Sequence, residues 1–329
     1  MTSGLASSRS LRPSRSAGLN LRHNGGACIL CEQSRVKILI PADALSDRQN
    51  VLKCFSCGLV FFEPRFTEAE VDPEEKVYWN GGSQKKIYFQ KEIRETFVKE
   101  FESRLKTMKR YQPGCGKLLD VGCGIGHFLD TARRQGWEVR GLDISENAAA
   151  AAQEAYELKV AVGTLEDSGF TDREFDCMTL WDVIEHIRRP LENVRAANRL
   201  LRNGGILVMK TPDESSLFKQ FARASYHLLG GSGSFLLKYV YYIPHYFSYT
   251  RKAMTLMLER SGFEVLEYEA DETPMEFAVE KIHVHYPKDP KRKWVVAGLP
   301  WVRRLARLLK RSNKMVVYAR KVRELNKDE

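Results

Sequence analysis

The chain has 329 residues, of which 43% are hydrophobic and 29% charged, and its formal net charge is +10. A chain of this length can bury a sizeable core, and one large domain with a small companion is the expected division. No apolar run reaches the roughly 18–20 residues of a membrane-spanning helix, so no such helix is predicted.

The positive charge is concentrated at the two ends of the chain. Residues 1–26 hold four arginines and no acidic residue, and residues 280–329 hold fifteen lysines and arginines against five acids. The stretch 27–279 is therefore net acidic, which argues against a nucleic-acid groove across the core. The C-terminal part is expected to present a basic surface.

Residues 1–27 are rich in Ser, Arg and Gly and lack the apolar segment of a secretory signal. This composition predicts a disordered leader, and an organellar transit peptide would share it. The seven cysteines do not form the framework of a secreted disulfide protein, so a reducing, cytoplasmic location is expected.

Residues 28–62 read as a small unit built on two C-x-x-C pairs. The cysteines are Cys28, Cys31, Cys54 and Cys57, and 22 residues separate the pairs. Four thiolates from two such turns suit tetrahedral zinc, which leaves no open position for water and is therefore structural. About 35 residues bury too little surface to fold alone, so the metal would supply the folding energy. A redox dithiol is the alternative.

A linker at 63–112 follows, with a helix expected over 83–111 that ends before Pro113 and Gly114. Beyond it, strands are predicted at 118–121, 137–142, 159–162, 175–180, 206–210, 263–270 and 314–320, and most of them alternate with helices. This order predicts an α/β fold with a mostly parallel sheet, whose ligands bind at the carboxyl ends of the strands. Residues 271–313 are an insertion that the minimal fold does not require.

The stretch KLLDVGCGIGHFLD, residues 117–130, is the chemical centre of the chain. A strand, a glycine turn and a helix in succession let the backbone approach a ligand closely, and the free N–H groups of the helix start favour a polar or anionic group. The next strand ends in Asp143, where an acid can reach ribose hydroxyls.

Four motifs in this order, DVGCGIG, GLDIS, FDCMTLWDVIEHIRRP and LRNGGILVMKTPD, resemble the class I S-adenosylmethionine (SAM) dependent methyltransferases. The resemblance covers roughly residues 117–211 and extends more loosely to 321. It implies a Rossmann-like seven-stranded sheet over 113–329 whose last strand is antiparallel, with SAM as cofactor.

By this resemblance, Asp120 lies below the amino group of SAM and the glycine turn faces its methionine part. Asp143 takes the ribose hydroxyls, and Ile144, Leu165 and Glu166 lie near the adenine. The full set of cofactor residues is Asp120, Gly122, Cys123, Gly124, Gly126, Asp143, Ile144, Leu165, Glu166 and Asp182.

The sequence D-x-x-E-H, from Asp182 to His186, leaves three readings open. His186 is a candidate general base, because its ordinary pKa lets it accept a proton at neutral pH. The triplet also resembles the D/E-x-x-E-H of ubiquinone O-methyltransferases, where a later His completes a divalent-ion site. Here His245 would be that residue, and Asp182, Glu185, His186 and His245 would hold Mg²⁺, Mn²⁺ or Zn²⁺. In the third reading Glu185 and His186 only shape the loop.

Residues 301–311, WVRRLARLLKR, predict a basic amphipathic helix with apolar residues on one face. Three uses fit this pattern: packing on the protein's own domain, contact with a membrane surface, or contact with RNA phosphates.

Together these features predict methyl transfer from SAM to an oxygen of a small-molecule, lipid-linked or sugar acceptor. One alternative is an RNA or protein methyltransferase whose zinc ribbon recognises the macromolecule. The other is a SAM-binding module without turnover. The sequence does not specify the acceptor atom or the oligomeric state.

Overall fold

The computed structural model describes residues 27–45, 50–63, 90–241 and 245–325. The predicted leader, apart from Ala27, lies outside the described residues, as does the linker from 64 to 89. The described part of the linker is the helix α3, Lys91–Tyr111.

Seven strands form the main sheet in the order β10-β11-β8-β7-β4-β5-β6. The five consecutive strands from β8 to β6 run parallel, and β11 is antiparallel to both β8 and β10. The bounds are β4 Lys117–Val121, β5 Glu138–Asp143, β6 Val160–Val162, β7 Phe175–Trp181, β8 Leu201–Pro212, β10 Phe263–Asp271 and β11 Lys314–Lys321. The prediction of a mostly parallel, Rossmann-like seven-stranded sheet is confirmed.

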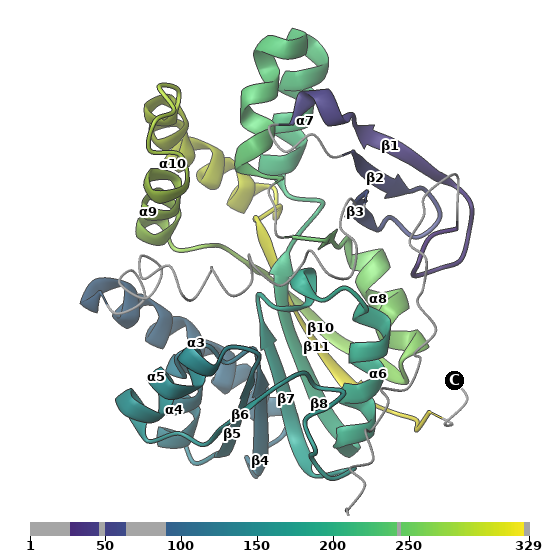
Figure 1. The fold of residues 1–329 in the computed structure, drawn as a ribbon, viewed down its shortest axis with the longest axis vertical. Coiled ribbons are helices and arrows are strands. Elements are labelled where there is room, and N and C mark those ends of the chain that lie inside the picture. Colours follow the sequence, from purple (N-terminus) through teal and green to yellow (C-terminus); the bar gives the residue numbers. More distant parts are fainter. Residues whose placement is uncertain (1–26, 46–49, 64–89, 242–244, 326–329) are drawn as a thin grey trace, which may run out of the picture.

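Helices cover both faces of this sheet (Figure 1). On one face lie α3, α4 (His127–Arg134) and α5 (Glu146–Tyr156), and on the other lie α6 (Pro190–Leu200) and α8 (Arg251–Arg260). A parallel strand covered on both faces is a continuous apolar run, and Leu118 and Leu119 of β4 are both fully buried. The helix starts follow local rules: the Ser145 hydroxyl accepts a hydrogen bond from the Ala148 amide at the start of α5.

The strand predicted at 206–210 is longer in the structure. β8 begins at Leu201, which pairs with Phe175 of β7, and the next pair joins Ile206 to Cys177. The segment Asn203-Gly204-Gly205 therefore bulges out of a continuous strand, and Gly204 adopts a φ of +76° there, a conformation that glycine permits.

A second, four-stranded sheet holds the two C-x-x-C pairs, in the order β1-β2-β3-β9. Its strands are β1 Val36–Ile40, β2 Val51–Cys54, β3 Val60–Phe62 and β9 Phe247–Ser248, and a short 3-10 turn, η1 Ala42–Ala44, follows β1. The last strand comes from the region after β8, so residues 28–62 do not complete their sheet alone. Cys28, Leu30 and Phe61 also pack in the same apolar cluster as Leu119 of the main sheet.

The remaining helices surround the carboxyl ends of the main strands. They are α7 Leu217–Leu229, the 3-10 segment η3 Gly230–Tyr239, and the insertion helices α9 Met275–His285 and α10 Arg292–Leu308. In Figure 1, α7, α9 and α10 lie beyond the strand ends, on the side away from the labels of β4 to β6.

The apolar face of α10 points outward. Trp301 and Leu308 are each 75% exposed, whereas Ala306 is buried and Arg303, from the predicted polar face, is largely covered. The helix therefore does not bury its apolar stripe against the described part of its own chain. Within those residues no helix has both the length and the apolar content needed to cross a membrane.

Candidate active site at the strand ends

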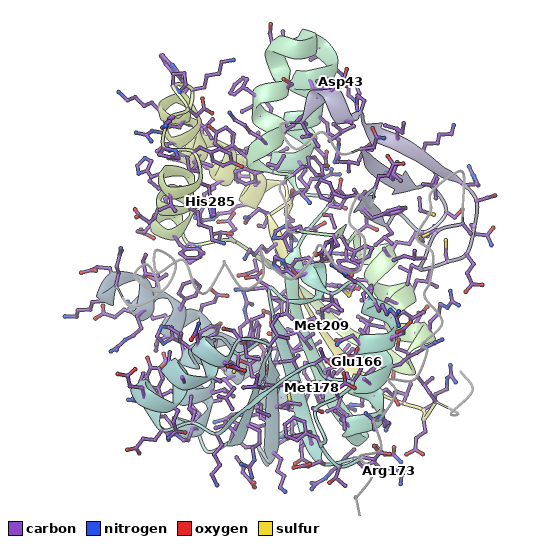
Figure 2. The ribbon with its side chains drawn as sticks, in the orientation of Figure 1. Asp43, Glu166, Arg173, Met178, Met209 and His285 are labelled. Carbon is purple, nitrogen blue, oxygen red and sulfur yellow. The ribbon has the colours of Figure 1, made fainter. Side chains whose placement is uncertain are left out.

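The carboxyl ends of the parallel strands open into a cavity of about 1230 Å³. One wall consists of the residues that follow β4, β5, β6 and β7, and the other comes from α7, α9 and α10. Figure 2 labels one residue of each wall, Glu166 after β6 and His285 on α9. Because pockets for one small ligand measure roughly 300–1000 Å³, this cavity has room for a cofactor and a second molecule.

Nine of the ten predicted cofactor residues line this cavity: Asp120, Gly122, Cys123, Gly124, Asp143, Ile144, Leu165, Glu166 and Asp182. The exception is Gly126, which forms the N-cap of α4 at a φ of +82°. A Cβ there would lie 2.4 Å from Leu158 Cδ1, so this glycine serves close packing beneath the turn.

The glycine turn and Asp143 are tied together. The Gly124 amide donates to Asp143 Oδ2 at 2.7 Å, and the Ser145 amide donates to Oδ1 at 2.9 Å. Gly122 has a φ of +66°, and a Cβ on it would lie 2.5 Å from Val183 Cγ2, so a side chain is excluded there. Burial raises the pKa of Asp143, while the hydrogen bonds from the Ser145 and Gly124 amides oppose that rise.

Asp120 is 2% exposed at the end of β4. Its Oδ1 accepts a hydrogen bond of 2.6 Å from the Thr179 hydroxyl. Burial is the main cause that raises the pKa of Asp120 to about 8, and the Asp143 carboxylate adds to it. A buried carboxyl of this kind is stabilised in its ionised form when a cation is placed beside it.

The three residues expected near an adenine differ in exposure. Leu165 is buried, whereas Ile144 is 55% exposed and Glu166 is exposed. Asn193 of α6 donates to Glu166 Oε1 at 3.3 Å. Ile144 and Leu165 therefore offer apolar surface to the cavity, and Glu166 offers a carboxylate at its rim.

Glu185, His186 and His245 meet in the wall of the cavity. One ligand atom from each lies within 4.8 Å of the others, and the two imidazole rings are 4.7 Å apart at 77°. Glu185 and His186 belong to the 3-10 turn η2, Ile184–His186, and His245 arrives from the segment before β9. The Tyr246 amide donates to the Glu185 carbonyl at 2.8 Å, which fixes the two segments together.

Glu185 is completely buried. The Thr211 hydroxyl donates to its Oε2 at 2.9 Å, and its Oε1 has no hydrogen-bond partner in the described structure. Burial, with the nearby Asp182 carboxylate, raises the pKa of Glu185 to about 8. Burial also lowers the pKa of His245, together with the positive charges around it. Burial therefore favours the uncharged form of both groups.

Asp182 stands apart from this trio. Its Oδ2 accepts a hydrogen bond from Lys314 at 2.5 Å and lies 3.6 Å from Lys210 Nζ. Burial alone would raise the pKa of Asp182, but the two ammonium groups outweigh it and hold the pKa at about 2. Its φ of +59° turns the backbone between β7 and the trio.

Lys210 and Lys314 are site residues that the sequence patterns did not single out. Lys210 ends the apolar part of β8 and also bonds Glu100 of α3 at 2.7 Å. Lys314 begins β11, which pairs directly with the end of β8. The only signal in the sequence was that Lys210 stands at the end of an apolar strand. Its position beside Asp182 depends on which strands pair, and the order of elements along the chain does not determine that pairing.

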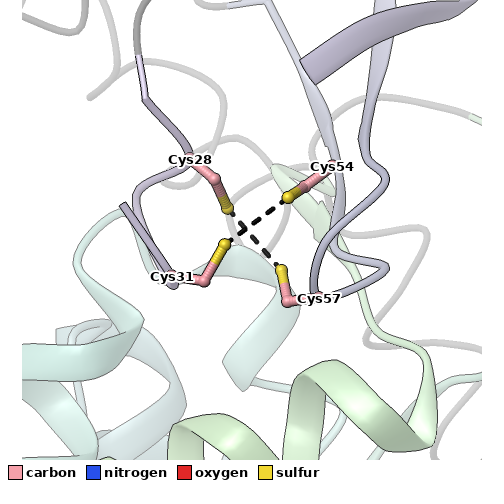
Figure 3. Close-up of side chains that lie close together, drawn as sticks. All are labelled: Cys28, Cys31, Cys54 and Cys57. Carbon is pink, nitrogen blue, oxygen red and sulfur yellow. Dashed lines mark hydrogen bonds between the residues drawn. The ribbon is translucent and has the colours of Figure 1, made fainter. Parts of the chain in front are cut away.

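The four cysteines of the small sheet form one cluster, drawn in Figure 3. The sulfur atoms of Cys28 and Cys57 lie 3.7 Å apart, those of Cys31 and Cys54 lie 3.5 Å apart, and no disulfide joins them. A tetrahedron with Zn–S bonds of about 2.3 Å has sulfur–sulfur edges of roughly 3.8 Å, so the arrangement fits zinc.

Comparison with known proteins agrees with this geometry. A family model described as a methyltransferase domain matches residues 89–268. The ubiquinone biosynthesis O-methyltransferase of Alkalilimnicola ehrlichii is 36% identical over 101 residues, which are 29% of this chain and 41% of that protein. The protein of the same description from a Ruegeria species is 32% identical over 118 residues, 34% of this chain and 47% of that one. The chain thus spans under half the length of these two relatives.

Solved structures are similar at lower identity. A SAM-dependent methyltransferase from Archaeoglobus fulgidus shares 18% identity at a TM-score of 0.46, over 69% of this chain and 94% of that one.

Proposed function

The chain belongs to the methyltransferase-domain family, and on that premise we propose that it transfers a methyl group from SAM to an oxygen of a small-molecule acceptor. The observation that carries this proposal is a convergence at one cavity. The glycine turn with Asp143 and the trio Glu185, His186 and His245 line the same space, which has room for two molecules.

The residues of the cofactor wall suit SAM. Asp143 presents a carboxylate to the ribose hydroxyls, and Ile144 and Leu165 supply an apolar face for the adenine. Asp120, whose pKa burial raises to about 8, becomes a carboxylate when the ammonium group of SAM lies beside it. When bound, SAM supplies an electrophilic methyl on a sulfonium; the protein's task is to orient the acceptor and exclude water.

The trio can remove the acceptor's proton in two ways. As a base, His186 accepts it directly. As ligands, the three residues would hold Mg²⁺ or Mn²⁺, which would lower the pKa of the acceptor hydroxyl so that its proton leaves to the solvent, and Glu185 would give up its own proton when the ion binds. Asp182 does not join this set, because Lys314 and Lys210 already compensate its charge.

Chelation separates the two chemistries. If an ion is needed, brief EDTA treatment abolishes turnover, Mg²⁺ or Mn²⁺ restores it, and His245→Ala loses activity as fully as His186→Ala. If His186 is the base, EDTA leaves turnover intact and His186→Ala removes it. A fully active His186→Ala enzyme refutes both assignments. Zinc content is measured alongside, since the cysteine cluster must keep its metal.

The cysteine cluster suits a structural zinc. Four thiolates occupy every position of a tetrahedral ion, so the metal stabilises the small sheet and takes no part in methyl transfer.

A membrane surface is the place where a lipid-linked acceptor would be met. Phe221, Leu228 and Leu229 of α7 and Trp294, Trp301, Leu305, Leu308 and Leu309 on or next to α10 are exposed apolar side chains, which we call the α7–α10 patch. Phe221 and Trp294 also line the cavity, so the patch reaches its mouth. Arginines and lysines in and next to α10 add attraction to anionic lipids.

The test is a turnover assay with isotopically labelled SAM against fractionated metabolite and lipid extracts. We expect a labelled product in which the transferred methyl group is bound to oxygen as a methyl ether. Calorimetry that finds no SAM binding would overturn the whole proposal. A labelled product methylated on nitrogen or carbon would overturn only the assignment of oxygen as the acceptor atom.

A further inference from the structure

Arg188 is a cation in the cavity wall without an acidic partner among the residues that the structure describes. It follows His186 by two positions, lines the cavity and is half-buried. Its Nη2 is buried and makes no hydrogen bond with the described residues. Its guanidinium carbon lies 5.7 Å from the centre of the Tyr246 ring. The neighbouring Arg189 differs in each respect, because it is exposed and bonds Glu192 at 3.2 Å.

A buried guanidinium nitrogen without a partner costs free energy. Such a group persists where something else stabilises it, and a bound anion does so with two parallel hydrogen bonds to the planar fork. The Tyr246 ring beside the guanidinium holds it in one orientation, as cation–π contacts do. Arg188 is therefore arranged to receive an anion from the cavity rather than to bind a carboxylate of its own chain.

The opposite wall has the same sign of charge. Lys219, Lys281 and Arg303 line the cavity from α7, α9 and α10, and none of the described cavity-lining residues on these helices is acidic, although Lys219 is paired with Glu214 at 3.1 Å. Arg303 bonds Glu272 through Nε and Nη2, yet its buried Nη1 has no partner in the described structure. Among the acids that line the cavity, Asp120, Asp143 and Glu166 lie on the cofactor wall, and Asp182 and Glu185 lie beside His186. Among the described residues, the wall formed by α7, α9 and α10 therefore presents cationic and no acidic side chains to the acceptor.

We propose that the methyl acceptor carries an anionic group, a carboxylate or a phosphate, and that Arg188 binds it. This inference rests on the proposed function, since it describes the acceptor of the same site. Because Arg188 and His186 line the same cavity two positions apart, we expect the anion near the hydroxyl that is methylated. Specificity follows, because an acceptor without the anion leaves the buried guanidinium nitrogen unpaired.

The first experiment measures anion binding directly. Protein labelled with ¹⁵N-arginine and saturated with S-adenosylhomocysteine is titrated with inorganic phosphate and, separately, with benzoate, and the arginine side-chain NMR signals are followed. We expect one anion to bind more tightly, which tells phosphate from carboxylate. Arg188→Gln should weaken that binding at least tenfold, and Arg188→Lys should weaken it less. Arg189→Gln is the matched control and should bind as the wild type does.

The second experiment tests the acceptor. Labelled products from the SAM assay are passed over an anion exchanger, where we expect them to be retained. Arg188→Gln should raise KM for that acceptor at least tenfold while its SAM affinity and melting temperature stay at the wild-type values.

Two results would overturn the inference: equal anion binding by wild type and Arg188→Gln, or a labelled product that the exchanger does not retain. Either result leaves the proposed function standing if SAM is bound and turned over. A failure to bind SAM would instead refute the proposed function.

Discussion

Two buried carboxyl groups set the pH behaviour of this site. Asp120 and Glu185 both have a pKa that burial raises to about 8. Between the ordinary pKa values of Asp and Glu and pH 8, these two carboxyl groups are ionised in the unfolded chain and protonated in the folded chain. Each group therefore lowers the free energy of unfolding as the pH rises through this range. Asp182 acts in the opposite direction, because its lowered pKa favours the folded state at neutral pH. The site thus retains groups that reduce stability unless a ligand stabilises them.

Asp120→Asn should stabilise the ligand-free protein relative to wild type at pH 8 and much less at pH 4. The variant loses the costly ionisation, and its side-chain oxygen still accepts the Thr179 hydrogen bond. Denaturant unfolding at the two pH values measures the difference. The same variant should bind SAM more weakly, and calorimetry in two buffers should show that wild type, unlike the variant, releases a proton on binding near pH 7. A stability difference that does not grow with pH would contradict the raised pKa.

Asp143→Ala should weaken SAM binding by roughly 1–3 kcal/mol, the scale of a lost charge-assisted hydrogen bond. The change removes the ribose partner and also frees the Gly124 amide. Titration calorimetry measures the affinity, with Asp172→Ala, an exposed acid paired with Arg199, as the control. Equal affinity in Asp143→Ala and wild type would remove Asp143 from the cofactor site.

At the scale of elements, the strand β9 links the cysteine sheet to the active site. Val60 and Phe61 of β3 pair with Ser248 and Phe247, and the Phe62 amide donates to the Tyr246 carbonyl at 3.2 Å. His245 immediately precedes this pairing. The turn that carries Cys54 and Cys57 also touches the start of α8, where Lys252 donates to the Ser56 carbonyl at 2.5 Å. The sheet that the zinc would stabilise is therefore the support of one histidine of the trio.

Cys54→Ser should lose zinc and also loosen residues 245–250. Hydrogen–deuterium exchange should show faster exchange at the Tyr246 and Phe247 amides, and turnover should fall while SAM affinity changes by less than about twofold, since β4 and β5 are untouched. Cys115→Ser, outside the cluster, is the matched control. Unchanged exchange at 245–250 after zinc loss would show that the small sheet does not position His245.

Across the whole molecule, basic and apolar surface gather on the side where the cavity opens. The α7–α10 patch leaves Trp294 79% exposed and Leu228 83% exposed. Exposed patches of this kind mark interaction sites. The acidic middle of the chain forms most of the sheet and its cofactor wall, and the basic C-terminal part contributes α10 to the side that would meet an anionic lipid surface.

The double variant Trp294→Ala, Trp301→Ala should reduce binding to vesicles of phosphatidylglycerol and phosphatidylcholine by tenfold or more, because each indole that is removed gives up roughly 1.5–3 kcal/mol of burial in the interface. Co-sedimentation at low and high salt measures binding, and added salt should weaken it. Ile38→Ala, an exposed apolar residue of β1, is the control. Equal binding by wild type and the double variant would place the α7–α10 patch away from the lipid.

The local order of strands and turns could be predicted from the sequence. An apolar run that ends in glycines, as at 117–126, encodes a buried strand and a turn within ten residues. Two C-x-x-C pairs likewise predict a tetrahedral cluster, because chelation depends on short spacings. The placement of Asp120 and Asp143 at one edge follows from parallel strand pairing, which repeated strand–helix units dictate.

Other features depended on contacts between distant parts of the chain. From the sequence we expected residues 28–62 to fold as a separate unit. In the structure their sheet is completed by Phe247 and Ser248, nearly two hundred residues later. From the sequence we expected Asp182 to join the trio. In the structure Asp182 instead accepts a hydrogen bond from Lys314, which lies more than a hundred residues later in the chain. The sequence also did not determine which face of α10 points outward. An amphipathic pattern shows that a helix has an apolar face, but it does not show what that face contacts. Short sequence motifs determined the residues of the cofactor wall of this protein. The packing of remote segments decided which residues form the acceptor wall and which charged side chains of the site are buried or paired. Burial and ion pairing arise between residues that are far apart in the sequence, so the tertiary structure was needed to show them.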